Sequence, residues 1–185
     1  AQRLLEGYHY RSLTENTKIC GVIGDPVDKS PGVAKHNALY QQLGIDAVYL
    51  PFPLKRDSLS EFLPLAARLG IHGLSVTMPL KEAICPLVET QEGAVNTLTL
   101  QQDRYTGLNF DGIGACNALG ELRGKRVVIL GAGGAARAIS VEAKRRGADV
   151  VVVNRTAKRA EQLADEIGVQ SRAPSEPSVA DIVIQ

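Results

Sequence analysis

A glycine-rich segment at residues 131–136 has the composition and spacing of a nucleotide-binding turn. Its sequence is GAGGAA, and it lies between an apolar strand pattern at 127–130 and a helix pattern. Gly131 permits a tight turn, and Gly133 lacks the Cβ that would hold a pyrophosphate away. The first amide groups of the following helix attract phosphate. The segment therefore predicts a dinucleotide site.

The end of the next strand pattern indicates which dinucleotide is bound. An NAD site usually has an acidic residue there for the ribose hydroxyl, whereas this sequence reads Asn-Arg-Thr, with Lys158 and Arg159 close behind. A guanidinium such as that of Arg155 can hold a 2′-phosphate, which a carboxylate would repel. We therefore predict NADP as the cofactor. The expected cofactor-binding residues are Gly131, Ala132, Gly133, Gly134, Ala135, Asn154, Arg155, Thr156 and Lys158.

Three segments in the first two thirds of the chain, SVTMPLK, GAVNT and NFDG, carry polar groups at strand ends or turns. Lys81 and Asp111 are suited to exchange a proton with a hydroxyl or carbonyl group. Thr77 and Asn96 are neutral hydrogen-bonding groups that suit a polyhydroxylated ligand. Taken singly, Lys81 is also an ordinary surface lysine and Asp111 an ordinary helix N-cap.

Alternating strand and helix patterns position these segments and predict an α/β fold with a mostly parallel sheet. The predicted strands are 19–23, 46–52, 73–78, 95–100, 105–108, 127–130, 149–153 and 180–184, and the predicted helices are 36–43, 59–69, 112–119, 135–146 and 157–167. The polar residues 101–104 (QQDR) predict a hairpin between the strands at 95–100 and 105–108. We divide the chain into a leader or linker (1–17), an α/β substrate-binding catalytic domain (18–120) and an incomplete Rossmann NADP-binding domain (121–185).

Composition narrows the range of functions. A net charge of +1 and an aromatic content of 4% argue against nucleic acid or a membrane surface as partner. The three cysteines are far apart and lack metal-ligand spacing, which predicts free thiols in a reducing cytoplasm and no metal site. No signal peptide and no apolar run long enough for a membrane span is evident.

In order along the chain, the motifs at residues 24–27 (GDPV), 75–81, 93–97, 109–111, 131–135 and 154–156 (NRT) resemble those of the shikimate dehydrogenase family. The resemblance implies an oxidoreductase that reversibly reduces 3-dehydroshikimate to shikimate with NADPH, in aromatic amino-acid biosynthesis. It also implies that Lys81 and Asp111 are the catalytic pair, and that Thr77 and Asn96 hold substrate hydroxyls or the carboxylate.

The sequence departs from the family pattern at the predicted carboxylate site. The family has Ser-x-Ser there, and an ungapped match places Ser30 on the first serine and Gly32 on the second. A match shifted by two residues instead places Ser30 and its following proline on the second serine and its proline. Phe110 stands where the family has Thr, which alters the catalytic turn. The connection from Lys81 to Asn96 is shorter than the family's helix, either because it is trimmed or because residues are absent.

The two ends of the sequence also differ from the family pattern. Family members continue beyond residue 185 into helices that complete the active site, so we expect this chain to carry an incomplete site. Residues 7–17 resemble the joint seen where a dehydroquinate dehydratase is fused ahead of the dehydrogenase, although an unrelated leader would also fit. Two other functions stay open: a quinate/shikimate dehydrogenase that uses NAD, and a non-catalytic regulatory protein that responds to shikimate or quinate.

Overall fold

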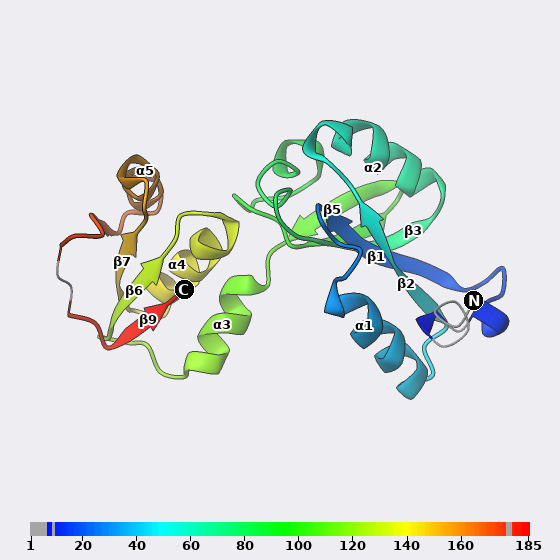
Figure 1. The fold of residues 1–185 in the computed structure, drawn as a ribbon, viewed down its shortest axis with the longest axis horizontal. Coiled ribbons are helices and arrows are strands. Elements are labelled where there is room, and N and C mark those ends of the chain that lie inside the picture. The colour runs from blue at the N-terminus through cyan, green and yellow to red at the C-terminus, as the bar shows by residue number, and fades with distance from the viewer. Residues whose placement is uncertain (1–6, 9, 177–178) are drawn as a thin grey trace. The chain divides into compact units, whose positions relative to one another are not determined.

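A computed structural model describes residues 7–8, 10–176 and 179–185, and the chain divides into two compact units, residues 1–108 and 109–185 (Figure 1). Of the predicted leader, residues 1–6 and 9 lie outside the described residues. Its described part contains a short 3-10 helix, η2 (Tyr10–Ser12). Near its end the Thr17 hydroxyl donates a 2.8 Å hydrogen bond to Asp46, which fastens the start of the first strand.

The first unit is built on a five-stranded sheet in the order β2-β1-β3-β4-β5. Its strands are β1 (Lys18–Gly24), β2 (Ala47–Pro53), β3 (Ile71–Val76), β4 (Thr97–Gln101) and β5 (Arg104–Leu108). β1 pairs in parallel with both β2 and β3, whereas β3–β4 and β4–β5 are antiparallel. The sequence predicted this combination of a parallel sheet and a hairpin, and the structure confirms it.

Helices cover both faces of this sheet (Figure 1). α2 (Leu59–Arg68) follows the short η3 (Arg56–Ser58) and buries Leu59 and Leu63 in the larger core. α1 (Pro31–Gln42) packs against β1 and β2 on the other face. The predicted start of α1 at residue 36 is wrong, because Ser30 caps the helix and Pro31 occupies its first turn.

The connection between Lys81 and Asn96 is a compact run of turns around η4 (Cys85–Leu87). Leu80 and Ile84 are fully buried and anchor this connection in the core. Further along, the Glu89 N–H donates to the carbonyl of Tyr105 at 3.0 Å and pairs the connection with β5. The segment from Lys81 to Asn96 therefore consists of turns and one short 3-10 helix, and contains no α-helix.

The second unit is a four-stranded parallel sheet in the order β8-β7-β6-β9. Its strands are β6 (Arg126–Leu130), β7 (Asp149–Val153), β8 (Gln170–Arg172) and β9 (Ile182–Ile184), and its helices are α3 (Asp111–Leu119), α4 (Gly134–Arg145) and α5 (Ala157–Ile167). The chain passes from β6 outward through β7 to β8 and then crosses back to β9, so β6 lies between β7 and β9. This arrangement confirms the predicted Rossmann-like sheet.

Two features of the second unit differ from the sequence interpretation. β8 was not predicted, because its three polar or charged residues show no strand pattern and it forms by pairing with β7. The boundary between units follows Leu108, whereas the pattern placed it after residue 120. The reason is that α3 packs closely on α4 and is therefore part of the second unit.

Candidate active site

Several predicted site residues of the first unit lie at one edge of its sheet. The parallel strands β1 and β3 end there, and the antiparallel β4 begins there. The Val76 N–H donates to the Asn96 carbonyl at 2.8 Å, and the Asn96 N–H donates to the Leu108 carbonyl at 3.0 Å. The Thr77 N–H donates to the Ile23 carbonyl at 3.0 Å. Thr77 and Asn96 are thus held on neighbouring strand ends, as expected for ligand sites of α/β proteins.

Gly24 allows the loops after β1 and β3 to pack closely at this edge. A Cβ on Gly24 would lie 2.4 Å from the Thr77 methyl carbon and 2.8 Å from the Met78 carbonyl oxygen. In addition, the Asp25 N–H donates to the Met78 carbonyl at 3.1 Å. The glycine of the GDPV motif therefore fixes the loop that leads to Lys81.

Lys81 and Asn96 are brought together by their backbones. The Val95 N–H donates a 2.7 Å hydrogen bond to the Lys81 carbonyl, so Lys81 lies beside the GAVNT turn. The Lys81 side chain is partly buried. The Thr97 hydroxyl donates to the Asn96 side-chain oxygen at 2.8 Å and orients that amide. An ammonium group and an amide on one rim suit a ligand with several hydroxyl groups.

Ser30 lies at the N-terminus of α1, after the end of β1. Its hydroxyl accepts a 3.3 Å hydrogen bond from the Gly32 N–H, inside the first helical turn. This turn is anchored because His36 Nδ1 contacts the Gly32 carbonyl at 2.8 Å and the His36 ring stacks on Tyr49. The family has a serine at both matched positions, 30 and 32. Because residue 32 is a glycine here, only Ser30 supplies a hydroxyl.

The predicted Asp111 belongs to the second unit. It is the first residue of α3, and its N–H donates to the Asn109 side-chain oxygen at 2.8 Å. The next residue, Gly112, is buried, and a Cβ there would lie 2.3 Å from the Ala138 carbonyl oxygen of α4. Because of this close approach, Asp111 is positioned by the helix that follows the glycine-rich turn. Phe110 is 50% exposed beside it.

The glycine-rich turn has the backbone that its sequence predicts. Gly131 has φ +138°, a value that L side chains rarely adopt, and its N–H donates to the Val153 carbonyl at 2.8 Å. A Cβ added to Gly133 would meet nothing within 4 Å, so open space lies over the start of α4. The Arg137 N–H donates to the Gly133 carbonyl at 2.9 Å and begins the helix. This open helix N-terminus fits a pyrophosphate.

The end of β7 is basic. Asn154 donates from its side chain to the Thr156 carbonyl at 3.0 Å and closes the turn before α5. Arg155, Lys158 and Arg159 are exposed, and none forms an ion pair with another described residue. Arg159 was not in the predicted cofactor-binding set, although it lies in the same first turn of α5 as Lys158. Exposed cations at this strand end fit the 2′-phosphate of NADP.

An ion-pair network centred on the buried Glu142 joins α4 to α3. Glu142 is 7% exposed, and its carboxylate accepts 2.7 Å hydrogen bonds from Arg145 and Arg146. These bonds, with Arg145 contributing most, lower the pKa of Glu142 from its ordinary 4.5 to about 2. Arg146 also donates to the Asn117 side chain of α3 at 2.7 Å. The network therefore holds α3, which carries Asp111, against α4.

The described part of the chain contains no metal-binding cluster, no disulfide bond and no membrane-spanning helix. No group of three His, Cys, Asp or Glu side chains gathers there as a metal site. The three cysteines form no disulfide bond; Cys116 is buried, and Cys20 and Cys85 are partly buried. No helix among the described residues is long and apolar enough to cross a membrane.

Comparison with known proteins identifies the family. The shikimate dehydrogenase substrate binding domain matches residues 22–98, and the shikimate / quinate 5-dehydrogenase domain matches residues 114–183. The chain is 43% identical over 178 residues to shikimate dehydrogenase (NADP(+)) of Methanopyrus kandleri, covering 88% of this chain and 61% of that protein.

Solved structures show the same relationship. Shikimate 5-dehydrogenase of Thermus thermophilus, in complex with NADP(H) and shikimate, is 32% identical with a TM-score of 0.77 and covers 84% of this chain and 62% of that one. A 5-ketofructose reductase of a Gluconobacter strain is 33% identical with a TM-score of 0.80, covering 92% and 69%. The chain spans less than two thirds of the length of the Methanopyrus and Thermus proteins. Both family domains match in order, and the chain belongs to the shikimate dehydrogenase family.

Proposed function

We propose that this chain forms the substrate-binding unit and part of the NADP-binding unit of an NADP-dependent shikimate dehydrogenase. The reaction is the reversible reduction of 3-dehydroshikimate to shikimate. The observation that carries the proposal is the edge of the first sheet, where backbone hydrogen bonds join the loops of Lys81 and Asn96. The relatives' names and the Thermus complex support the substrate and the cofactor.

The proposed substrate-binding and catalytic residues have distinct roles. Lys81 takes the proton from the substrate hydroxyl during oxidation and returns it during reduction. Asn96, oriented by Thr97, and Thr77 hold ring hydroxyls, and the Ser30 hydroxyl binds the carboxylate. Asp111, at the start of α3, orients the reacting hydroxyl.

The residues of the second unit bind the cofactor. Gly131 and Gly133 leave the start of α4 open for the pyrophosphate. Arg155 holds the 2′-phosphate, with Lys158 and Arg159 beside it. When bound, the nicotinamide ring of NADP carries the hydride. The protein's part is then to position the two ligands and to move a proton.

Activity of the full-length protein with and without Lys81 tests the proposal. We expect reduction of NADP by shikimate, followed by absorbance, and a fall in kcat of about 100-fold or more in Lys81→Ala. The matched control is Lys55→Ala, an exposed lysine of the same unit, which should leave kcat unchanged. Equal activity of Lys81→Ala and wild type would refute the role of Lys81. Shikimate binding without turnover in wild type would favour the regulatory alternative.

A second candidate function is the reduction of another polyhydroxylated ketone that lacks a carboxylate. It is favoured by Gly32, which supplies no second hydroxyl for a carboxylate, and by the likeness to a 5-ketofructose reductase. Comparing kcat/KM for the oxidation of shikimate and quinate by NADP or NAD, and for the reduction of 5-ketofructose by NADPH or NADH, separates these functions. A preference for quinate with NAD would instead support the quinate/shikimate dehydrogenase alternative.

Two further assignments extend the proposal. Because the three cysteines form no disulfide bond, a reducing cytoplasm is favoured as the place of reaction. We also retain the prediction that residues 7–17 are part of a joint to a fused dehydroquinate dehydratase. Measuring the mass of the protein in its native cells would test this. A dehydratase fusion would add a whole further domain to that mass.

A further inference from the structure

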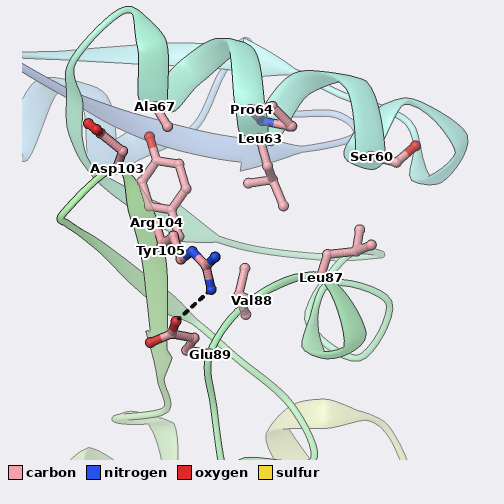
Figure 2. A pocket seen from close by; sticks show the side chains of 10 residues that line it. All are labelled: Ser60, Leu63, Pro64, Ala67, Leu87, Val88, Glu89, Asp103, Arg104 and Tyr105. Carbon is pink, nitrogen blue, oxygen red and sulfur yellow. Dashed lines mark ion pairs between the residues drawn. The ribbon is translucent and has the colours of Figure 1, made fainter.

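The first unit contains a cavity along α2 that shares no lining residue with the candidate active site. Its volume is about 390 Å³, which is in the range of small-molecule sites. α2 forms one wall, the segment after η4 forms another, and the start of β5 closes the end (Figure 2). β4 begins at the Asn96 edge and runs away from it, so Arg104 at the start of β5 lies at the far edge. The cavity is therefore separate from the proposed substrate site.

The walls of this cavity are largely apolar. Leu63 points from α2 toward Val88 of the facing segment, and Leu87 lies beside Val88 (Figure 2). The Tyr105 hydroxyl donates to the Ile71 carbonyl at 2.7 Å, and burial raises the pKa of Tyr105 to about 12. Because that hydroxyl is already paired and stays protonated, the tyrosine contributes its ring to the wall. A ligand with a large apolar group would be accommodated here.

The rim of the cavity carries a loose ion pair. Arg104 and Glu89 are 3.6 Å apart, and their side chains are 79% and 64% exposed. Close charge-assisted hydrogen bonds are about 2.7–2.9 Å long, and the Arg126–Asp149 pair of this protein measures 2.7 Å. The Arg104–Glu89 contact therefore contributes little free energy, and each side chain can replace it with a contact to a charged group of a ligand.

We propose that this cavity binds a free α-amino acid with a large apolar side chain. The ammonium and carboxylate groups of an α-amino acid are about 3 Å apart, which matches the separation of the two charges on the rim. The ligand carboxylate binds the Arg104 guanidinium, and its ammonium binds the Glu89 carboxylate, so that each charge faces its opposite. The apolar side chain lies between Leu63 and Val88. The proposal concerns binding and stands independently of the proposed dehydrogenase activity.

Titration calorimetry of the full-length protein with L-phenylalanine and L-leucine tests this proposal. We expect saturable binding, with 3-phenylpropionate and phenethylamine each at least about tenfold weaker than L-phenylalanine, because each lacks one charge. No saturation at millimolar L-phenylalanine or L-leucine, or equal binding of either single-charge analogue, would overturn the proposal.

Variants of the rim locate the site. Arg104→Gln and Glu89→Gln should each weaken L-phenylalanine binding about tenfold. Both side chains are exposed, and the contacts of Glu89 with β5 use only its backbone, so the variants should fold. The matched control is Arg56→Gln, an exposed arginine of the same unit, which should bind as wild type does. Unchanged affinity in both rim variants would show that the amino acid binds elsewhere and would overturn the assignment.

Discussion

Removing the charge of Glu142 should destabilise the second unit by an amount that depends on pH. Lowering the pKa of this carboxyl from 4.5 to about 2 corresponds to about 3 kcal/mol of folding free energy. Arg145, the main cause of the lowering, is 70% exposed and screened by water. We therefore expect Glu142→Gln to lose about 2 kcal/mol at pH 7. The matched control is Glu161→Gln, an exposed glutamate of α5, which should stay within about 0.5 kcal/mol of wild type.

The sign of the pH effect follows from the direction of the pKa change. The folded pKa of Glu142 lies below the unfolded value, so its contribution is full above about pH 4.5 and is lost as pH falls toward about 2. Urea unfolding followed by circular dichroism, at pH 7 and at pH 3, measures it for wild type and both variants. The deficit of Glu142→Gln should shrink by more than half at pH 3. A deficit of equal size at both values, or none at pH 7, would refute this reasoning.

Two further predictions test the second unit. Arg155→Gln should raise the KM for NADP about tenfold or more while the KM for NAD changes little, and Arg123→Gln is the exposed control. Steady-state kinetics of the full-length protein measures both KM values, and an equal change for the two cofactors would contradict the assignment. Gly112→Ala should lower the free energy of unfolding by about 1–3 kcal/mol, because its Cβ would lie 2.3 Å from the Ala138 carbonyl oxygen. The control is Gly114→Ala on the same helix, where an added Cβ would meet nothing within 4 Å, so the variant should be neutral or stabilising. Equal stability of the two alanine variants in urea unfolding would refute the packing argument.

The sequence predicted the features that depend on short, local patterns. The GAGGAA turn follows its strand directly, so its Gly131 conformation and the open space at Gly133 could be anticipated from neighbouring residues alone. The hairpin of β4 and β5 was predicted from the polar residues of its turn. The start of α1 was missed because Gly32 interrupts the helical pattern in the first turn, where capping by Ser30 determines the conformation.

Features that join distant segments could not be predicted in the same way. The approach of Lys81 to Asn96 depends on a hydrogen bond from Val95, and the motifs alone gave only their order. The cavity of the first unit combines residues of α2, the segment after η4 and β5, none of which has a recognisable motif. β8 forms only because β7 offers it a partner edge.

Packing in the second unit links Asp111, which orients the reacting hydroxyl in the proposed mechanism, to the cofactor turn. Asp111 is followed by Gly112, whose missing Cβ lets α3 approach the backbone of α4. α4 starts at the glycine-rich turn, and Glu142 holds its other end to α3 through Arg146. A change at either contact would move the start of α3 relative to the turn. The roles of Asp111 and of the turn are therefore coupled by one helix pair, so substitutions at Gly112 or Glu142 should affect kcat as well as stability.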